Sequence, residues 1–289
     1  MTQLITSELQ HPKCGLSVAQ MCGLAQITRG QFYRHRRAAL VAQSDSPLSE
    51  AVKAVALEMP SYGYRRVTAH LRRNGRAVNG KTVLRSMRHQ NLLCKRRRRF
   101  VRTTESLHAH PAYPNLAREM RVTDINKLWI ADITYVPMTR GFVYLAAVLD
   151  AYSRRVIGWA ISRSLDAEVA LAALQMALAT RTIDVGLVHH SDRGVQYACC
   201  NYTGLLKEHS VQISMSRSGN PYDNARCERF MRTLKEEEVY LSEYETLAEA
   251  KASIAHFIEA VYNTKRLHSA LGYMPPAEFE QQLCQSNGA

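Results

Sequence analysis

The strongest constraint on the fold is a group of three β-rich segments separated only by short turns. They cover residues 128–138, 142–150 and 155–162, and their turns lie at Arg140–Gly141 and Ser153–Arg154. β-branched and aromatic residues dominate the three segments, as is typical of strands. Because turns this short join antiparallel neighbours, the sequence predicts an antiparallel meander.

Helices and further strands alternate after the meander, which predicts an α/β fold. The expected order is a helix over 166–180, a strand over 186–190, a helix over 201–209 and a strand over 211–215. Later parts of the chain add an amphipathic helix over 246–262 and a tail over 263–279 that packs back on the core.

Residues 216–238 form a predicted loop followed by a helix. Asn220 and Pro221 supply a capping residue and a ring suited to the first helical position. The predicted buried face has apolar residues three and four positions apart, namely Cys227, Phe230, Met231 and Leu234. At about 100° per residue, the flank of this face carries Glu228, Arg232 and Lys235. Glu228 then either borders a cleft or is an ordinary solvated residue paired with Arg232 and Lys235.

Positive charge is concentrated in the N-terminal part of the chain. The formal net charge is +13, but the first 121 residues carry 22 Lys and Arg against 6 Asp and Glu, and the remainder carries 16 against 19. Such a block indicates a polyanionic partner, and nucleic acid is favoured over anionic lipid because no amphipathic Trp-rich helix accompanies it. The alternative is a merely solvated basic face.

Two small helical units are predicted in this basic part. Residues 17–37 have helix-turn-helix spacing, with a turn near Gly23 and a second helix whose end faces DNA through Phe32, Tyr33, Arg34, Arg36 and Arg37. Helices over 48–59, 65–73 and from about 78 form a three-helix unit with one basic face. The side chains expected to position phosphates are Arg65, Arg66, Lys81, Arg85 and Arg88.

An unbroken cationic run follows, and Arg96, Arg97 and Arg98 within it are expected to bind the DNA backbone. The prolines near residue 114 then complete a linker. The resulting division is a helix-turn-helix-like segment (1–45), a basic DNA-binding unit (46–94), a linker (95–122), a catalytic core (123–240) and a C-terminal helix with tail (241–289).

Composition narrows the cellular setting. Seven cysteines lack paired spacing, so reduced thiols are expected. Zinc at His189, His190, Cys199 and Cys200 is disfavoured because adjacent strand residues point to opposite faces. No apolar run is long enough to span a bilayer and no secretory leader is visible, so we expect a cytoplasmic protein without a membrane partner.

Three carboxylates stand out as candidates for chemistry. Asp132 interrupts an apolar strand, Asp192 follows the fourth strand, and Glu228 lies on the later helix. Two divalent metals about 3.5–4 Å apart can drive phosphodiester transfer, and Mg²⁺ prefers carboxylate oxygens. Basic and amide groups nearby, which could hold substrate phosphate, are Lys235, Arg193 and Gln196.

Three motifs resemble the signatures of bacterial insertion-sequence transposases that have a retroviral-integrase-like core. They read WIADITY at 129–135, HSDRGVQY at 190–197 and SRSGNPYDNARCERFMRTLKEE at 216–237. The segments YGYRRV at 62–67 and YNTKRLHSALGYMPPAEF at 262–279 resemble the regions that flank this core. The likeness therefore covers most of the chain, with one departure: Leu267 stands where the family pattern usually has proline, which puts the packing of the tail in question.

The resemblance implies a ribonuclease-H-like mixed sheet with flanking helices, preceded by small all-α DNA-binding units. It also implies that Asp132, Asp192 and Glu228 are the catalytic residues and hold two Mg²⁺ (or Mn²⁺) ions, and that Lys235 contacts DNA, with Arg232, Arg193, Gln196 and Asn224 as further DNA contacts. The implied activity is cleavage and strand transfer at element ends through a circular intermediate. Implied partners are DNA, a second copy of the chain and an upstream-frame protein joined by ribosomal frameshifting.

Two other functions are compatible with the same residues. A regulator derived from a transposase would bind DNA without cleaving it. A structure-selective nuclease of the same fold would hydrolyse DNA without joining ends.

Overall fold

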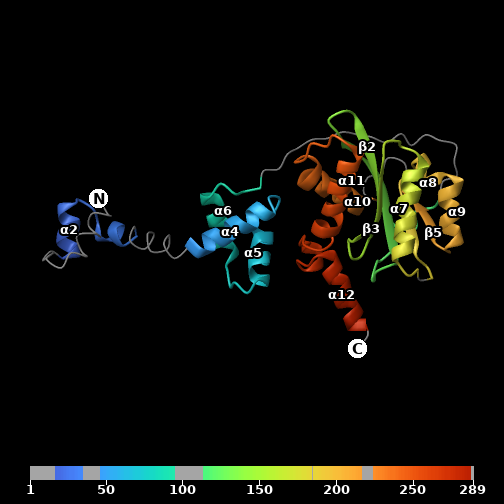
Figure 1. Cartoon of the computed structure of the whole chain (residues 1–289). Coiled ribbons are helices and arrows are strands. Elements are labelled where there is room, and N and C mark those ends of the chain that lie inside the picture. Colours follow the sequence, from blue (N-terminus) through green and yellow to red (C-terminus); the bar gives the residue numbers. More distant parts are fainter. Residues whose placement is uncertain (1–16, 35–45, 95–112, 184, 217–223, 288–289) are drawn as a thin grey trace. The chain divides into compact units, whose positions relative to one another are not determined.

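The computed structural model describes residues 17–34, 46–94, 113–183, 185–216 and 224–287. The chain divides into two compact units, residues 1–94 and 95–289, and each is considered by itself. Figure 1 shows that helices alone make up the described part of the first unit, whereas the second contains the sheet. Among the described residues, no helix is both long and apolar enough to cross a membrane.

The first unit begins with a small helical pair. Helix α2 (Val18–Leu24) is capped by Ser17, and a second helical stretch covers residues 29–34. The turn lies at residues 25–26, slightly later than the predicted turn near Gly23. Phe32 is fully buried against Met21 and Cys22, so the expectation that it faces DNA was wrong: its ring supplies the core of this pair. Arg36 and Arg37 lie outside the described residues.

The predicted three-helix unit is confirmed. It consists of α4 (Ser46–Glu58), α5 (Tyr64–Arg73) and α6 (Gly80–His89). The Asn79 side chain caps α6 by accepting from the backbone N–H of Lys81 at 2.9 Å. Apolar residues from all three helices are buried, among them Val52, Val67, Leu71, Val83 and Met87.

The second unit is built on a five-stranded mixed sheet in the order β3-β2-β1-β4-β5. Strands β1 (Leu128–Pro137), β2 (Phe142–Asp150) and β3 (Val156–Ser162) form the predicted antiparallel meander. Strands β4 (Val188–Ser191) and β5 (Gln212–Met215) extend the sheet in parallel to β1. The meander was thus predictable from its turns, and the parallel half follows from the helices that cross over between strands.

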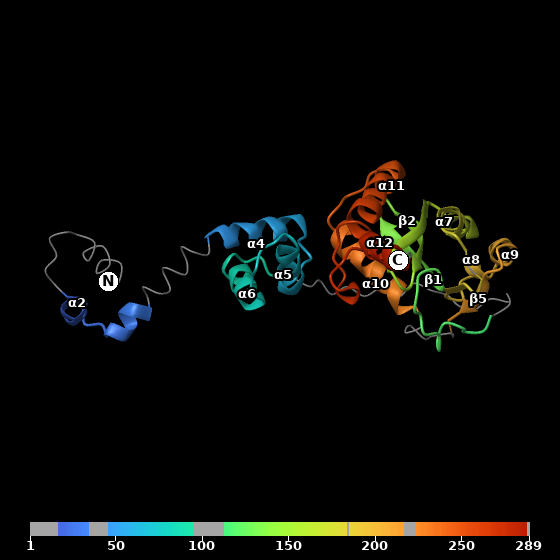
Figure 2. The ribbon, with the colours of Figure 1, turned by 90° about the horizontal axis from the view of Figure 1, so that it is seen from below.

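Helices cover both faces of this sheet, as Figures 1 and 2 show. One face packs against α7 (Ala167–Thr180), α8 (Val195–Ala198) and α9 (Cys200–Glu208). The other packs against α10 (Ala225–Leu234), its π-helical continuation η1 (Lys235–Val239), α11 (Leu247–His256) and the π-helical η2 (Phe257–Tyr262). Alternate residues of each central strand therefore enter two separate cores.

Helix α10 begins later than the sequence suggested. Its first residue is Ala225 and its N-cap is Asn224, whereas the predicted start at Asn220–Pro221 falls outside the described residues. The predicted buried face is confirmed, because each of its four apolar side chains is at most 5% exposed: Cys227, Phe230, Met231 and Leu234.

The C-terminal tail packs on the core, as predicted. It contains η3 (Ser269–Leu271) and α12 (Pro276–Asn287). The Asn263 side chain exchanges two hydrogen bonds of 3.0 Å with the backbone of Val156 on β3. Arg266 forms a buried bidentate pair with Glu237 on η1, at 2.7 and 2.8 Å. Leu267 is 3% exposed, so the residue that departs from the family pattern is part of the packed tail.

Residues 113–122 differ from a free linker. The backbone N–H of Leu116 donates to Ser214 Oγ on β5 at 2.9 Å, and Met215 N donates to the carbonyl of Pro114 at 3.4 Å. Ala117, Met120 and Val122 pack against the core. This segment therefore belongs to the structure of the second unit.

Candidate active site

Two of the three candidate acids lie at the same level of the sheet. Strands β1 and β4 pair in parallel, and the last pair in their register is Ile130 with His190. Asp132 and Asp192 each follow that pair by two residues. Parallel pairing therefore places Asp132, in the middle of β1, level with Asp192, which directly follows the C-terminal end of β4.

The other candidate groups affect the pKa of Asp132. Burial, followed by the charge of Asp192, raises the pKa of Asp132 to about 8; Glu228 adds to the rise, whereas Lys235 and a hydrogen bond from the Ile133 N–H oppose it. That N–H donates to Asp132 Oδ1 at 2.9 Å. As a residue Asp132 is half-buried, but its carboxylate is shielded from water. A nearby cation stabilises the ionised form of a carboxyl group that is shielded from water.

The loop after β4 holds Asp192 in place. Its Oδ1 accepts the Gly194 N–H at 2.9 Å. A Cβ on Gly194 would lie 3.0 Å from both Asp192 Oδ1 and Gln196 Oε1, so glycine leaves room for the two polar groups. Arg193 Nε donates to the carbonyl of Ser216, and Gln196 Nε2 donates to that of Leu165. Arg193 and Gln196, expected on DNA, are thus partly engaged in fixing this loop.

Glu228 lies on α10, on the flank predicted for it. The residue is exposed, and partial burial of its carboxylate raises its pKa while Arg232 opposes the rise. Arg232 is also exposed. Leu128 and Ile130 of β1 share a core with α10, and Asp132, two residues further along the strand, points to the same face of the sheet.

Lys235 is the first residue of η1, and its ammonium lies over an aromatic ring. Its Nζ is 4.0 Å from the ring centroid of Tyr135 on β1. Partial burial lowers the pKa of Lys235, and the charge of Asp132 opposes this change. We did not predict the role of Tyr135, since nothing in the spacing of residues 135 and 235 indicates that they meet.

Asn224 differs from the expectation of a DNA contact. Its side chain is buried, and Nδ2 donates to the carbonyl of Ala131 at 3.2 Å. Because Ala131 precedes Asp132, this bond ties the start of α10 to the strand that carries the first aspartate. Among the described residues, Asn224 Oδ1 has no hydrogen-bond partner.

Buried polar residues beneath the site were not predicted as a group. Tyr197 is buried within the electrostatic reach of Asp132 and Asp192, and burial raises its pKa well above the ordinary value. His190 places its two ring nitrogens 2.8 Å from Ser214 Oγ and 3.0 Å from Ser216 Oγ. His189 Nε2 lies 3.0 Å from the Tyr202 hydroxyl. The histidines therefore connect β4 with β5 and α9.

The candidate acids fit a divalent cation by their chemistry. Among the described residues, no three His, Cys, Asp or Glu side chains are close enough together to hold one metal ion. Mg²⁺ does not need three, since it is usually bound by one or two carboxylates together with water and substrate phosphate. The adjacent Asp132 and Asp192, whose mutual repulsion a cation would relieve, meet that requirement.

Several basic side chains of the first unit are exposed on its surface. Lys81, Arg85 and Arg88 are exposed and share one face of α6, and Arg65 is exposed on α5. The guanidinium of Arg66 lies 5.5 Å from the ring centroid of Tyr62. Arg96, Arg97 and Arg98 lie outside the described residues.

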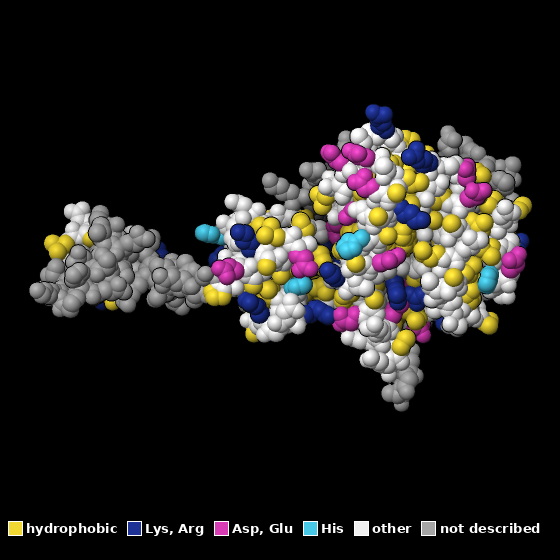
Figure 3. Space-filling model, viewed as in Figure 1, with side chains coloured by type: hydrophobic (Ala, Val, Ile, Leu, Met, Phe, Trp, Pro, Cys, Tyr) yellow, Lys and Arg dark blue, Asp and Glu magenta, His cyan; other side chains and the backbone are white. Residues whose placement is uncertain are grey.

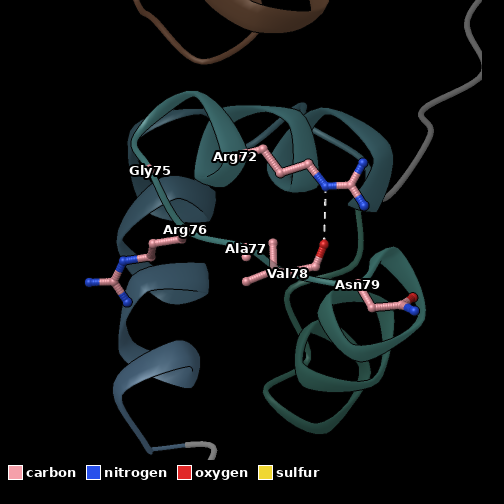
Figure 4. A pocket seen from close by; sticks show the side chains of 6 residues that line it. All are labelled: Arg72, Gly75, Arg76, Ala77, Val78 and Asn79. Atoms are coloured by element: carbon pink, nitrogen blue, oxygen red, sulfur yellow. Dashed lines mark hydrogen bonds between the residues drawn. The ribbon is translucent and has the colours of Figure 1, made fainter.

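The connection between α5 and α6 forms a hollow with a volume of about 560 Å³. Figure 4 shows Arg72 reaching along this connection to the carbonyl of Val78, to which its Nε donates at 3.0 Å, while Arg76 points away. Arg76 donates to the carbonyl of Pro47 at 3.1 Å. Arg72 and Arg76 therefore hold the segment that leads into α6 in place. The N-terminus of a helix is a favourable position for a phosphate.

Charge is distributed differently over the second unit. On the face drawn in Figure 3, basic and acidic side chains are interspersed over it. This agrees with the sequence, in which the excess of Lys and Arg belongs to the first 121 residues.

The sheet order, the helices on both faces and the two aspartates at one level of neighbouring strands define a ribonuclease-H-like integrase core. Family models agree: an integrase core domain matches residues 123–221, a second integrase core model matches 209–276, and an HTH-like domain matches 43–100. The integrase core family is metal-dependent.

The chain belongs to the insertion-sequence transposases. It is 37% identical to the transposase for insertion sequence element IS904 of Lactococcus lactis, over 86% of this chain and 98% of that protein. It is 35% identical to transposase InsF for insertion sequence IS3A of Escherichia coli, over 92% and 94%. A 31 kDa protein of insertion element IS600 from Shigella sonnei is 35% identical over 92% and 99%.

Similar solved structures are integrases. The catalytic core domain of BIV integrase has a TM-score of 0.43 and 19% identity, over 57% of this chain and 99% of that chain. The catalytic core of HTLV-2 integrase in complex with magnesium has a TM-score of 0.41 and 12% identity, over 53% and 95%.

Proposed function

We propose that this protein cleaves and joins the ends of an insertion sequence by metal-dependent phosphodiester transesterification, with Asp132, Asp192 and Glu228 as its catalytic residues. The observation that carries the proposal is the level placement of Asp132 on β1 and Asp192 directly after the parallel strand β4, on a sheet that α10 covers. The transposase relatives over most of the chain support the same reaction.

Each side chain has a distinct part in this proposal. The three carboxylates would hold two Mg²⁺ (or Mn²⁺) ions, which would activate the attacking oxygen and neutralise the leaving one. Because burial and Asp192 raise the pKa of Asp132 to about 8, a cation bound there would take the place of a proton on its carboxyl group at neutral pH. Lys235 and Arg232 face the DNA beside the acids, and Asn224 positions α10 through Ala131.

DNA is the proposed partner of both units. In the first unit, Lys81, Arg85 and Arg88 bind the backbone from one face of α6, with Arg65 and Arg66 beside them. Residues 46–94 act as the DNA-binding unit, and 123–240 as the catalytic core. We further propose that at least two copies act together, since two element ends must be joined, and that an upstream-frame protein takes part.

The test is strand transfer with a pre-cleaved element end and Mg²⁺. Asp132→Asn, Asp192→Asn and Glu228→Gln should each lower the rate by at least about 10²-fold, the effect of removing one electrostatic stabiliser of a transition state. Glu208→Gln on the exposed surface of α9 is the matched control and should keep the wild-type rate.

Full activity in all three active-site variants would contradict the assignment. End binding by the wild type without cleavage under any divalent metal would favour a regulator. Hydrolysis without joining would favour a nuclease.

A further inference from the structure

Helix α10 has a second polar flank, which the proposed reaction does not use. Arg226 and Arg229 are three residues apart and therefore share one side of the helix. At about 100° per residue, Arg226 is about 160° from Glu228, with the buried stripe between them. Arg226 thus lies on the side of α10 opposite Glu228, whereas Arg229, about 100° from Glu228, lies on the exposed back of the helix.

A third arginine meets this flank from the sheet. Arg154 lies in the connection between β2 and β3, with a φ of 63°, a left-handed conformation that costs free energy for a residue with a Cβ. Burial, followed by the positive charge of Arg226, lowers the pKa of Arg154; Tyr262 opposes this and Arg229 adds to it. Arg154 and Arg226 line the same cavity, and the positive charges of Arg226 and Arg229 both disfavour the charged form of Arg154.

Three other arginines of this unit have acidic partners. Arg155 and Arg181 both pair with Glu280 at 2.7 Å, and Arg266 pairs with Glu237 at 2.7 Å. Within the described part of the chain, the side chains of Arg154, Arg226 and Arg229 form no hydrogen bond or salt bridge with a carboxylate. Asp150 attracts Arg226, but Asp150 already accepts the N–H groups of Asn126, Tyr152 and Ser153.

A cavity of about 450 Å³ lies beside these arginines. Arg154 and Arg226 line it together with an apolar wall that includes Leu271, Met274 and Phe279. The ring of Phe279 is 5.6 Å from that of Tyr152, which also lines the cavity. The cationic part of the cavity lining suits the phosphate of a nucleotide. The apolar and aromatic part suits its base.

We propose that Arg154, Arg226 and Arg229 form a second phosphate-binding site of the catalytic core, which holds the backbone of a DNA strand beside the cavity on the Arg226 flank of α10. The proposal rests on the proposed function, since a transposase must hold DNA on both sides of the reacting bond. An unpaired cluster of three arginines is a ready site for phosphate, because guanidinium groups bind its oxygens bidentately.

The test compares DNA binding by the full chain in EDTA, where no cleavage occurs, over a series of salt concentrations. Arg226→Gln/Arg229→Gln should weaken duplex binding about tenfold or more at low salt. It should also reduce the slope of log K against log [salt] by up to about two, since each phosphate contact contributes about 0.9. Lys251→Gln, an exposed change on α11, is the control for loss of one positive charge.

Two further measurements distinguish the ligand and the fold. Arg226→Lys/Arg229→Lys should restore the salt slope, because it restores both charges. Inorganic phosphate and deoxynucleoside monophosphate should each raise the thermal midpoint of the wild type, and the double Gln variant should lose this rise. Circular dichroism should show the same helix content in every variant.

A wild-type affinity and salt slope in the double Gln variant would overturn the inference. Loss of the phosphate-induced rise with unchanged DNA binding would also overturn it, since the site would then bind only free phosphate. Neither result depends on strand transfer, so failure of the proposed reaction is recognised separately, by inactivity of the wild type.

Discussion

Single residues on β1 and β4 show how strongly burial changes ionisation in this core. Burial raises the pKa of Asp132 to about 8, whereas burial, with the neighbouring His190, lowers the pKa of His189 to about 3. Both effects favour the neutral form of the side chain. The consequences differ, because Asp132 belongs to the proposed reaction and His189 to the packing beneath it.

His189 should make the catalytic core sensitive to acid. Its folded-state pKa lies below the unfolded value of about 6.5, so the unfolded chain binds more protons between these values, and stability falls as pH decreases below 6.5. We expect a loss of about 2 kcal/mol between pH 7 and pH 5 from this group. Chemical denaturation across this range should show a smaller loss in His189→Gln than in the wild type.

One outcome of this experiment would contradict the prediction for His189. If His189→Gln follows the wild-type pH profile, another group causes the acid sensitivity. Urea unfolding at pH 7 provides the reference for each variant, because His189 is neutral there and titration does not contribute.

At the scale of helices and strands, the contact between β3 and α7 is unusually close. A Cβ on Gly158 would lie 2.1 Å from the carbonyl oxygen of Ala173 and 2.8 Å from the backbone nitrogen of Ala177. Both neighbouring atoms are helix backbone, so they cannot rotate away as a side chain would. Glycine and alanine at these positions let the helix backbone approach the sheet.

Gly158→Ala should therefore destabilise the second unit by about 3 kcal/mol or more, as overpacking of a core does. The denaturant midpoint of that unit measures this loss. Gly204→Ala on α9 is the matched control: nothing lies within 4 Å of its Cβ position, and alanine in a helix should stabilise by about 0.5–1 kcal/mol. A shift of equal sign in the two variants would contradict the close packing.

Helix α10 joins several features of the molecule. Its buried stripe packs on the sheet, one flank carries Glu228 with Lys235 beyond it, and the opposite flank carries Arg226, with Arg229 on the exposed back of the helix. The N-cap Asn224 ties its start to β1, and the Arg266–Glu237 pair ties the tail to its continuation η1. One helix can thus relate the reacting bond to DNA on two sides.

On the scale of the whole molecule, the chain has separate hydrophobic cores in its two units. Residues such as Val83 are buried among α4, α5 and α6, whereas Val169 of α7 is buried against the sheet. Separate cores predict that damage to one unit leaves the other folded.

Val83→Ala should lower the stability of the three-helix unit by about 2 kcal/mol, because it removes buried methyl groups. Hydrogen exchange should show faster exchange in α4, α5 and α6 and unchanged protection in β1 and β2. Val169→Ala should give the reverse pattern. Faster exchange in both units from either change would show that they unfold together.

The sequence by itself determined the local structure and the chemistry of the protein. β-rich segments with short turns specified the meander, and the spacing of apolar residues specified the three-helix unit and the buried face of α10, because these patterns repeat within a few neighbouring positions. The motifs around Asp132, Asp192 and Glu228 indicated the family, which the transposase relatives then confirmed.

Only the tertiary structure decided which distant side chains meet. These contacts join residues about 70 to 100 positions apart. They are Lys235 over the Tyr135 ring, Asn224 with the carbonyl of Ala131, and Arg154 near Arg226 and Arg229. Such contacts depend on the parallel register of β1 and β4 and on how α10 packs across the sheet. Strand register and helix packing leave no periodic signal in the sequence. The spacing of side chains along one strand or helix does not specify which other strand or helix lies beside it.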